Sequence, residues 1–188
     1  QHKNNQQLAQ DSDAARELQA LVLQAVQRDA LFFSAALPKR IFNPLFNRYS
    51  GATNFYGDHV DGAILHSRAT QQWVRTDFSC LFCLADPDEY EGGELTVREH
   101  EGDKRIKLPA GDAILYPGST VHQVAPVTRG ARLASFFWVE SMVRSTGQRR
   151  LLFDMDMALL ALRQKGESAE ATRLTGVYHN LLRMWADT

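Results

Sequence analysis

The chain has 188 residues, of which 44% are hydrophobic, and its 21 basic and 22 acidic side chains give a formal net charge of −1. This length suits one domain with a sizeable core, and the near-neutral charge gives no support for nucleic-acid or membrane-surface binding. The longest apolar runs, such as "LFFSAAL", are too short to span a bilayer. We therefore expect a soluble cytoplasmic protein. The chain starts at Gln1 without a signal-peptide pattern, so we expect an N-terminal piece to be missing.

The first predicted element is an amphipathic helix over residues 13–29. Its apolar side chains follow the i, i+3, i+4, i+7 spacing of one helix face: Leu18, Leu21, Val22, Ala25 and Val26. Asp13 is the expected N-cap, because a short carboxylate accepts well from the free N–H groups of a first turn. We expect the stripe to pack on the core.

From about residue 44 to residue 140, short apolar or alternating runs are separated by turn signals. Gly92-Gly93, residues 109–112 and Pro117-Gly118 supply these breaks, and no long helical stripe interrupts the pattern. This texture predicts a mainly β sandwich or barrel.

After Glu140 the helical period returns as two apolar stripes, broken at residues 166–168. Their members are Leu151, Leu152, Met155, Leu159 and Leu162, then Leu174, Val177, Tyr178, Leu181, Leu182 and Trp185. They predict a hairpin of two helices of about four turns each, which covers the β-core or forms a homo-oligomer interface. Arg149-Arg150 is expected to be a solvated helix start. We therefore divide the chain into a β-domain with a flanking N-terminal helix, residues 1–140, and a helical region, residues 141–188.

Two cysteines, Cys80 and Cys83, form a C-x-x-C within "DFSCLFCLAD". A redox pair or half of a zinc site are the functional interpretations of such a motif. However, the segment is typical of a buried strand, on which positions i and i+3 point to opposite faces. We expect two buried structural thiols in a reducing compartment.

His59 and Asp61 lie two residues apart in "FYGDHVDGAI". On an extended segment both side chains point to one face, whereas Asp58 points away. Imidazole and carboxylate together suit Fe(II), Mn(II) or Zn(II). A lone H-x-D is weak evidence, because such pairs also arise by chance.

His122 is the best third ligand among the other histidines. It lies where a new strand begins in "LYPGSTVHQVAPV", 61 residues beyond Asp61. A β-barrel easily brings separate strands to face a common interior.

Arg132 puts a charge inside "GARLASFFWVE", which is otherwise an apolar strand. A guanidinium in such a desolvated place needs an anion. That anion is either an internal carboxylate or a carboxylate ligand held in a bidentate manner, for which Ala134 on the same face leaves room. Tyr49, ten residues before His59 on the strand that precedes it, either supplies a hydroxyl to this ligand or is an ordinary core tyrosine.

The set His59-x-Asp61, His122 and Arg132 resembles the Fe(II)/2-oxoglutarate-dependent dioxygenases, and "NRY", "GGEL" and R-x5-W resemble landmarks of their prolyl-hydroxylase-like branch. Closer still, the chain from about residue 4 onward resembles the bacterial PKHD-type hydroxylases, also called the PiuC family. The segments that carry this resemblance are "PLFNRYSG", "VRTDFS", "YEGGEL", "LPAGDAILYP", "HQVAPVTRG" and "SMVRSTGQRRLLFDMD".

The resemblance implies a double-stranded β-helix (jelly-roll, cupin-like) core that holds Fe(II) through His59, Asp61 and His122. It further implies that Arg132, assisted by Tyr49, binds the distal carboxylate of 2-oxoglutarate. With O₂, and with ascorbate as a further expected cofactor, the co-substrate would yield succinate and CO₂ while a substrate C–H bond is hydroxylated. Because Asp61 is present where related halogenases lack a carboxylate, hydroxylation is the expected outcome.

One residue departs from the pattern of the animal prolyl hydroxylases. Near Phe82 they carry a tyrosine that reaches the 2-oxoglutarate tail, and Phe82 has no hydroxyl. The tail is then expected to depend more on Arg132 or on another donor such as Tyr116.

Two alternatives to the dioxygenase stay open. A cupin-like zinc-dependent isomerase or hydrolase would need the metal ligands but not Arg132. A protein that only senses iron or 2-oxoglutarate would keep the whole ligand set. The resemblance also implies a link to bacterial iron acquisition and a small-molecule or peptide substrate, with Arg68, Gln72 and Arg75 expected near the entrance.

Overall fold

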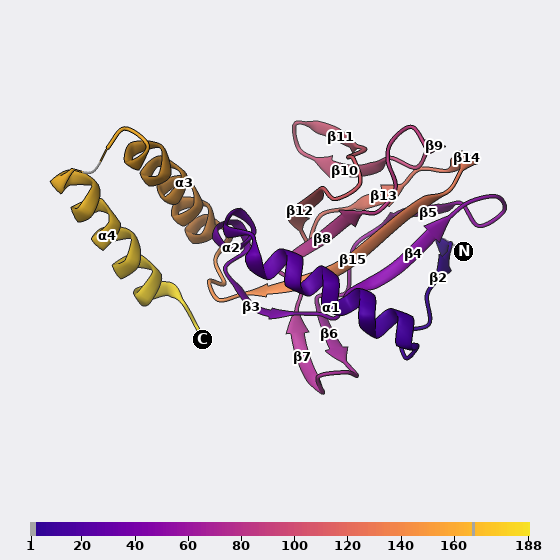
Figure 1. The fold of residues 1–188 in the computed structure, drawn as a ribbon, viewed down its shortest axis with the longest axis horizontal. Helices are drawn as coiled ribbons and strands as arrows, with labels where there is room; N and C mark the ends of the chain where they lie inside the picture. Colours follow the sequence, from indigo (N-terminus) through magenta and orange to yellow (C-terminus); the bar gives the residue numbers. More distant parts are fainter. Residues whose placement is uncertain (1–2, 167) are drawn as a thin grey trace.

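The computed structural model describes residues 3–166 and 168–188. Two antiparallel sheets form the body of the molecule, and helices occupy the N-terminal and C-terminal parts of the chain (Figure 1). The predicted joint between the two C-terminal helices includes residue 167, which lies outside the described residues. Within the described residues no helix is long and apolar enough to cross a membrane.

The first sheet has the strand order β1-β5-β13-β10-β11. Its strands are β1 (Lys3–Asn4), β5 (Phe55–His59), β13 (His122–Val124), β10 (Leu95–Glu99) and β11 (Gly102–Ile106). Strand β1 forms one edge of this sheet and pairs with β5. Strand β5 in turn pairs with β13, the central strand, which follows it in the chain by more than sixty residues.

The second sheet has the order β12-β8-β15-β4-β2, and β3 pairs with the far end of β15. Its strands are β12 (Ala113–Pro117), β8 (Phe78–Cys83), β15 (Arg132–Ser141), β4 (Leu45–Tyr49), β2 (Gln6–Gln7) and β3 (Pro38–Ile41). Two smaller strand pairs complete the described β-structure: β6 (Ile64–Ser67) with β7 (Gln72–Arg75), and β9 (Tyr90–Gly92) with β14 (Val127–Gly130).

The inner faces of the two sheets pack on each other. Leu81 and Cys83 of β8 and Ala134 of β15 are buried against Leu95 and Val97 of β10. Side chains alternate between the faces of a strand, so these residues mark the faces that are turned toward the core. The predicted mainly β, jelly-roll architecture is confirmed.

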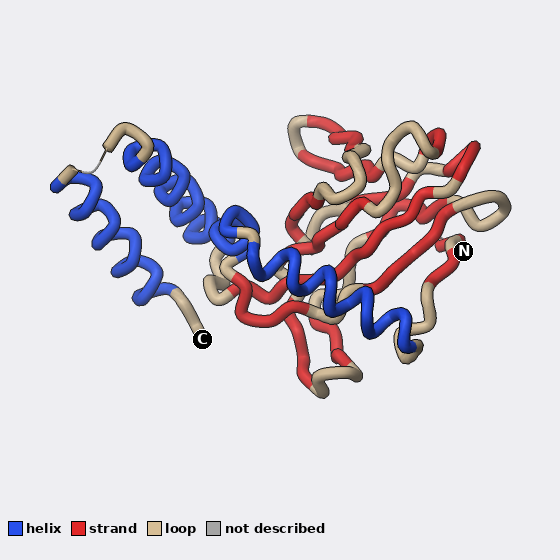
Figure 2. The backbone as a smooth tube through the Cα atoms, in the orientation of Figure 1, coloured by secondary structure: helices blue, strands red, loops and turns tan. Residues whose placement is uncertain are grey.

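The outer face of the second sheet is covered by α1 (Asp13–Arg28) and α2 (Ala30–Ala36), and Figure 2 shows α1 lying across its strands. Val22, Val26 and Phe32 of these helices are buried against Cys80 and Phe137 of the sheet. The expected helix over residues 13–29 is therefore present and packs on the core.

Three details of the N-terminal region differ from the sequence prediction. The N-cap of α1 is Ser12, whose hydroxyl accepts from the Ala15 N–H at 3.1 Å, so the expected Asp13 cap is wrong. Leu18 and Leu21 are exposed, because only the Val22 and Val26 side of the stripe faces the sheet. The helix α2 was not predicted; a second cap, Asp29 to the Phe32 N–H, starts it.

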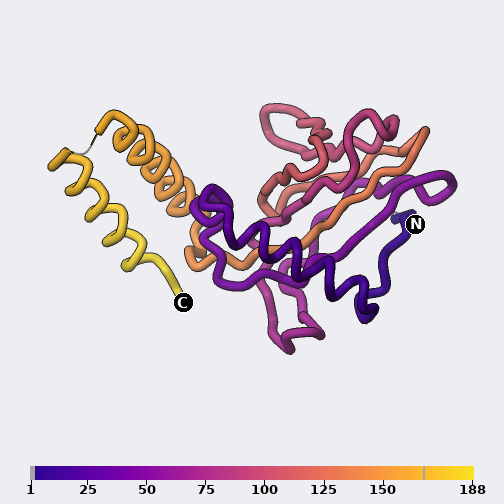
Figure 3. The backbone as a smooth tube through the Cα atoms, in the orientation of Figure 1, coloured from indigo at the N-terminus to yellow at the C-terminus, as the bar shows by residue number. Residues whose placement is uncertain are grey.

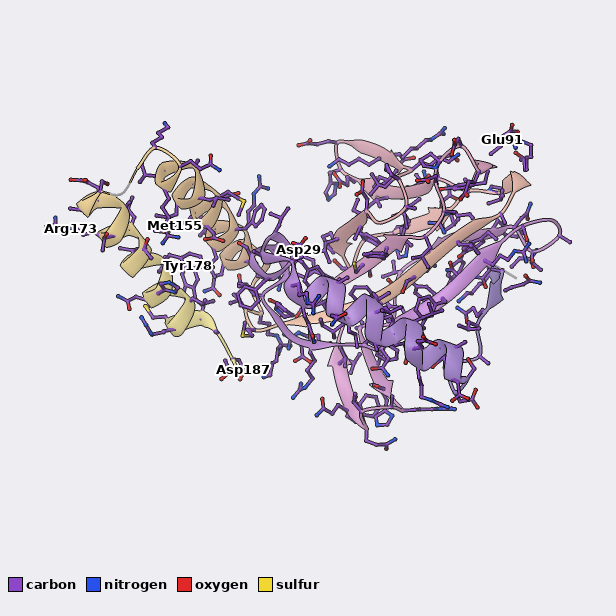
Figure 4. All side chains as sticks on the ribbon, viewed as in Figure 1. Asp29, Glu91, Met155, Arg173, Tyr178 and Asp187 are labelled. Atoms are coloured by element: carbon purple, nitrogen blue, oxygen red, sulfur yellow. The ribbon has the colours of Figure 1, made fainter. Side chains whose placement is uncertain are left out.

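Helices α3 (Thr146–Arg163) and α4 (Ala169–Trp185) form the predicted C-terminal hairpin, which projects away from the sheets in Figure 3. Met155 and Tyr178 face each other between the two helices (Figure 4), within a cluster that Leu37 and Val143 join to the β-domain. With 18 and 17 residues, each helix has about five turns rather than the predicted four.

Several residues of the two predicted C-terminal stripes are not buried. Leu151, Leu174 and Val177 are exposed in the single chain, so they do not pack in its core. Each stripe is narrower than predicted, because a hairpin buries only the line where its helices touch.

A buried salt-bridge cluster joins α3 to the second sheet, and it consists of Arg75, Asp77, Glu140 and Arg149. Arg149 is 5% exposed, so the expected solvated helix start is wrong for this residue. The side chain of Arg150 is exposed, as expected. Asp77 also accepts from the backbone N–H of Ser141 at 2.8 Å. The cluster fixes the chain at the point where β15 ends.

The two cysteines are free and buried. Cys80 packs on the helix side of β8, whereas Cys83 packs between the sheets. Their thiols diverge as strand parity predicts, and burial raises the pKa of both thiols. The geometry agrees with structural thiols.

Candidate metal centre

Two histidines face each other across neighbouring strands. His59 is the last residue of β5 and His122 the first of β13, and the two are direct partners in the antiparallel register. Directly opposed residues share one face of a sheet. Their ring centroids are 4.1 Å apart, and His122 is buried.

Backbone carbonyls orient both imidazole rings. The Nδ1 atom of His59 lies 2.8 Å from the Gly57 carbonyl, and that of His122 lies 2.9 Å from the Thr120 carbonyl. A carbonyl only accepts, so each Nδ1 is the protonated nitrogen and each Nε2 offers its lone pair. Burial lowers the pKa of His59, which favours the neutral ring that a metal requires.

Asp61 completes the group two residues after His59. Its Oδ1 lies 3.9 Å from His59 Nε2 and its Oδ2 lies 3.7 Å from His122 Nε2. One ligand atom from each of the three residues lies within 4.8 Å of the others. Ser79 on β8 donates a 2.5 Å hydrogen bond to Oδ2, which fixes the carboxylate. Two imidazoles and one carboxylate on one side of an ion form the facial arrangement that suits Fe(II).

Asp58 lies outside this group, as strand parity predicts. It forms an ion pair with Arg98 of β10, and its side chain is half exposed. Of the two aspartates in "FYGDHVDGAI", only Asp61 is positioned to bind a metal.

The three residues border a cavity of about 230 Å³ between the sheets. Arg132, the first residue of β15, lines the same cavity and is 3% exposed. Its Nη1 atom has no hydrogen-bond partner in the described residues, and none of their carboxylates forms an ion pair with it. The predicted internal salt bridge is therefore absent from that part of the chain, and the guanidinium offers free donors to an anion inside the cavity.

The chain matches known proteins along its whole length. Residues 44–140 match the family described as 2OG-Fe(II) oxygenase superfamily, and residues 147–187 match the PKHD-type hydroxylase C-terminal domain. A PKHD-type hydroxylase of Polaromonas sp. strain JS666 is 62% identical over 189 residues, which is 100% of this chain and 83% of that protein. The chain belongs to the PKHD-type hydroxylases. A second member, from Verminephrobacter eiseniae, is 61% identical over the same shares.

Membership of this family defines the type of reaction. PKHD-type hydroxylases fall within the 2-oxoglutarate- and Fe(II)-dependent oxygenases, so the protein is an oxidoreductase that uses Fe(II) and 2-oxoglutarate. Among solved structures, the 2-oxoglutarate-dependent epimerase SnoN of nogalamycin biosynthesis has a TM-score of 0.50 at 18% identity, covering 74% of this chain and 61% of that one. That likeness concerns the fold alone.

The PKHD-type "GGEL" motif is explained by space next to Arg132. Gly93 has a φ of +71°, and a Cβ atom on it would lie 3.0 Å from Cδ of Arg132 and 2.9 Å from a methyl group of Val127. A larger residue would therefore strain the backbone and displace the guanidinium. Gly93 allows β15 and the loop before β10 to approach closely where Arg132 enters the cavity.

Two tyrosines line the cavity with Arg132. Tyr49 is 1% exposed, its ring lies 5.4 Å from the guanidinium carbon, and its hydroxyl accepts from Nδ2 of Asn47 at 3.3 Å. Tyr116 packs its ring against His122 with centroids 4.9 Å apart. Burial raises the pKa of both hydroxyls, so each stays protonated and can donate a hydrogen bond.

Phe82 has no part in the cavity. It lies on the other face of β8, among residues of α1, α2 and β12, while Leu81 and Cys83 face inward. Phe82 is therefore not the position of β8 from which a tyrosine could reach the co-substrate, and the greater dependence on Arg132 or Tyr116 stays a prediction. Ala134 is inward-facing but packs with Leu81 and Cys83, so it leaves no extra room beside Arg132.

The predicted entrance residues do not border the cavity. Arg75 forms ion pairs with Asp77 and Glu140 instead, and the cavity lining does not include Arg68 or Gln72. Sequence reasoning placed them there only because the 62–77 loop follows the metal pair. In the structure, β6 and β7 form a separate hairpin (Figure 1).

Among the cavity-lining residues that sequence reasoning missed are four with polar groups, namely Lys3, Asn47, Tyr56 and Ser79. The parity of β4 puts Asn47 on the same face as Tyr49, which is a signal that the sequence contains. Lys3 and Ser79 come from strands that only the fold brings to the metal group, and no local pattern marks them.

Proposed function

We propose that His59, Asp61 and His122 hold the Fe(II) of this enzyme, and that Arg132 binds the distal carboxylate of 2-oxoglutarate. The observation that carries the proposal is the buried guanidinium of Arg132, which lines the cavity that the three ligands border and whose Nη1 has no hydrogen-bond partner in the described residues. A zinc-dependent cupin enzyme would gain nothing from this desolvated cation, and removing it from water costs free energy that only a bound anion offsets.

The protein's own groups position the reactants. Ser79 and the carbonyls of Gly57 and Thr120 hold the three side chains that would bind Fe(II) at the border of the cavity. Tyr49 and Tyr116 offer protonated hydroxyls to the carboxylate beside Arg132. When bound, Fe(II) and 2-oxoglutarate supply the oxidising chemistry, in which O₂ converts the co-substrate to succinate and CO₂ and a substrate C–H bond is hydroxylated.

The natural chain should give a visible charge-transfer band when Fe(II) and 2-oxoglutarate are added without O₂, and slow succinate formation once O₂ enters. In Arg132→Ala the band should require far more 2-oxoglutarate, whereas Fe(II) binding should persist. Arg129→Ala is the matched control, since Arg129 is an exposed partner of Glu91 and should behave like the natural chain. If neither band nor succinate forms in a folded protein, the proposed function is wrong.

The substrate class, cellular role, location and domain division of the enzyme are proposed on more general observations. We propose a small molecule or peptide as substrate, and a link to bacterial iron acquisition that is supported by the resemblance to the PiuC family alone. A cytoplasmic location is supported by the two free, buried thiols. A division of the chain after residue 140 is supported by the end of β15 at Ser141.

Homo-oligomerisation through the C-terminal hairpin is a further part of the proposal. Leu174, Val177 and Met184 are exposed on α4 at the i, i+3, i+10 spacing of one helix face. The oligomeric state, measured by light scattering of the natural chain and of Val177→Glu, tests this interface. A monomeric natural chain would exclude it.

A further inference from the structure

A second cation reaches the cavity from the N-terminal strand. Lys3 lies on β1, pairs with Tyr56 of β5, and lines the cavity together with the metal group. Its ammonium lies 5.1 Å from the ring centroid of Tyr56 and 5.6 Å from that of Phe136. Tyr56 in turn stacks on His59 with centroids 3.5 Å apart. Lys3 is therefore on the metal side of the cavity.

The Lys3 ammonium forms no salt bridge within the described part of the chain. No carboxylate of the described residues forms an ion pair with it, whereas Lys39 and Lys104 both have such partners on the surface. Burial lowers the pKa of Lys3, and the nearby Asp61 charge opposes this effect. Two aromatic faces stabilise the cation but leave its N–H donors without strong acceptors.

The two cations of the cavity have different neighbours. Arg132 lies over Tyr49 and beside Gly93, while Lys3 lies over Tyr56 and Phe136. In the proposed function, the two carboxylates of 2-oxoglutarate already have the metal and Arg132 as partners. Counting Fe(II), the co-substrate dianion, Asp61 and both cations, the site keeps one net positive charge, and the half-buried Lys3 is the cation without an anion to balance it.

We propose that Lys3 binds a carboxylate of the substrate that is to be hydroxylated. The apolar part of this substrate lies against Tyr56, Phe136 and Trp138, which also line the cavity. The inference rests on the proposed function, since it requires 2-oxoglutarate at Arg132. It adds the substrate class, an organic acid with an apolar or aromatic body, and a specificity-determining residue.

The test uses the full chain loaded with Mn(II), which binds where Fe(II) does without starting turnover, and with saturating 2-oxoglutarate. Three carboxylate and amide pairs serve as probes in calorimetric titrations: benzoate, phenylacetate and 3-phenylpropanoate, each against its amide. Lys3→Met keeps the aliphatic stem on the two rings and removes only the charge. Lys104→Met removes one surface charge and is the matched control.

We expect the natural chain and Lys104→Met to bind at least one carboxylate about tenfold or more tightly than its amide, as a charge-assisted hydrogen bond implies. Lys3→Met should lose this preference and still bind 2-oxoglutarate as tightly as the natural chain. The proposal is overturned if no pair shows a preference, or if Lys3→Met keeps it. A loss of 2-oxoglutarate affinity in Lys3→Met would assign the ammonium to the co-substrate and also overturn the proposal.

The 2-oxoglutarate titration of the natural chain separates this inference from the proposed function. If 2-oxoglutarate itself does not bind, the proposed function fails. If 2-oxoglutarate binds but the carboxylate preference is missing, only the role of Lys3 fails.

Discussion

Strand β15 carries buried charge near both of its ends, and the two ends differ in how that charge is partnered. Near its C-terminal end, Glu140 accepts from Arg40 at 3.0 Å and from the backbone N–H of Arg75 at 3.3 Å. At its N-terminal end, Arg132 lines the cavity, and its Nη1 has no hydrogen-bond partner within the described part of the chain. The same strand thus contributes to a closed structural cluster and to an open binding site.

Two buried arginines make the difference specific. Arg149 donates to the carbonyls of Val143 and Arg144 and to the hydroxyl of Thr146, at 2.8 to 3.0 Å. Arg132 is as well buried, but its Nη1 has no acceptor in the described residues. Burial alone does not separate a structural arginine from a ligand-binding one. Arg149 also has a buried Nε without a partner in the described residues, but both of its terminal nitrogens are occupied, whereas the terminal Nη1 of Arg132 is not.

The largest effect should come from the open end, at the metal group. Asp61→Ala removes one of the three ligands, so Fe(II) affinity should fall by about 10³-fold or more. Removing only the hydrogen-bond partner of a ligand typically lowers metal affinity about 10–100-fold, and loss of the ligand itself should exceed that. Equilibrium dialysis of the metal-loaded protein measures this affinity.

The neighbouring aspartate provides the control for that change. Asp58 is paired with Arg98 at the surface, so Asp58→Ala should leave Fe(II) affinity unchanged and alter the free energy of unfolding by less than about 1 kcal/mol. Equal losses of Fe(II) in the two variants would show that the ligands have been misassigned.

A substitution in the salt-bridge cluster at the C-terminal end of β15 should change the stability of the fold rather than ligand binding. Arg149→Met leaves three acceptors near α3 without their donor, and the free energy of unfolding should fall by about 3 kcal/mol. Urea denaturation measures it. Arg150→Met, at the adjacent exposed position, should change it by less than about 0.5 kcal/mol. Similar stabilities of the two variants would contradict a structural role for Arg149.

A smaller effect is expected at Ser79, whose hydroxyl holds the Asp61 carboxylate. Ser79→Ala removes the hydrogen bond to Asp61, so Fe(II) affinity should fall about tenfold while the fold stays intact. The equilibrium dialysis described for Asp61→Ala also measures the Fe(II) affinity of this variant. An unchanged affinity would mean that Asp61 is held by the backbone alone.

The sequence predicted the site better than it predicted the buried charges. The i, i+2 spacing of His59 and Asp61 and the place of His122 at a strand start predicted the ligand set, although β5 ends at His59 and Asp61 follows it outside the strand. The roles of these residues stay a prediction, but their convergence is observed. For Arg149 the sequence suggested solvent, since a helix start is usually exposed. Only the position of α3 against β15 buries it.

The fold shows the same division between local and tertiary information. The N-terminal helix, the β region and the C-terminal hairpin follow from their periods. The short strand β1 does not, because its two residues become a strand only by pairing with β5. Lys3, which this pairing places beside the metal group, could not be found without the fold.

The smallest expected effect concerns the thiols on the two faces of β8. Burial raises the pKa of Cys80 and Cys83, so the folded protein keeps their protons while unfolded thiols ionise above about pH 8.5. The free energy of unfolding should then fall as pH rises above that value, by at most about 1.4 kcal/mol per pH unit for each thiol. Urea denaturation at pH 7.5 and 9.5 checks this, and Cys80→Ala should weaken the slope. An identical slope would show that the Cys80 thiol is not shielded.

The difference between the two ends of β15 is tested most directly by titrating 2-oxoglutarate into Mn(II)-loaded Arg132→Ala and Arg149→Met, with each value referred to the folded fraction. The affinity of Arg132→Ala should fall by roughly 100-fold or more, as expected when one partner of a buried charge pair is removed, while its Mn(II) affinity and stability persist. Arg149→Met should keep the affinity of the natural chain. Unchanged 2-oxoglutarate affinity in Arg132→Ala would contradict the account, and so would joint loss of 2-oxoglutarate and Mn(II) binding.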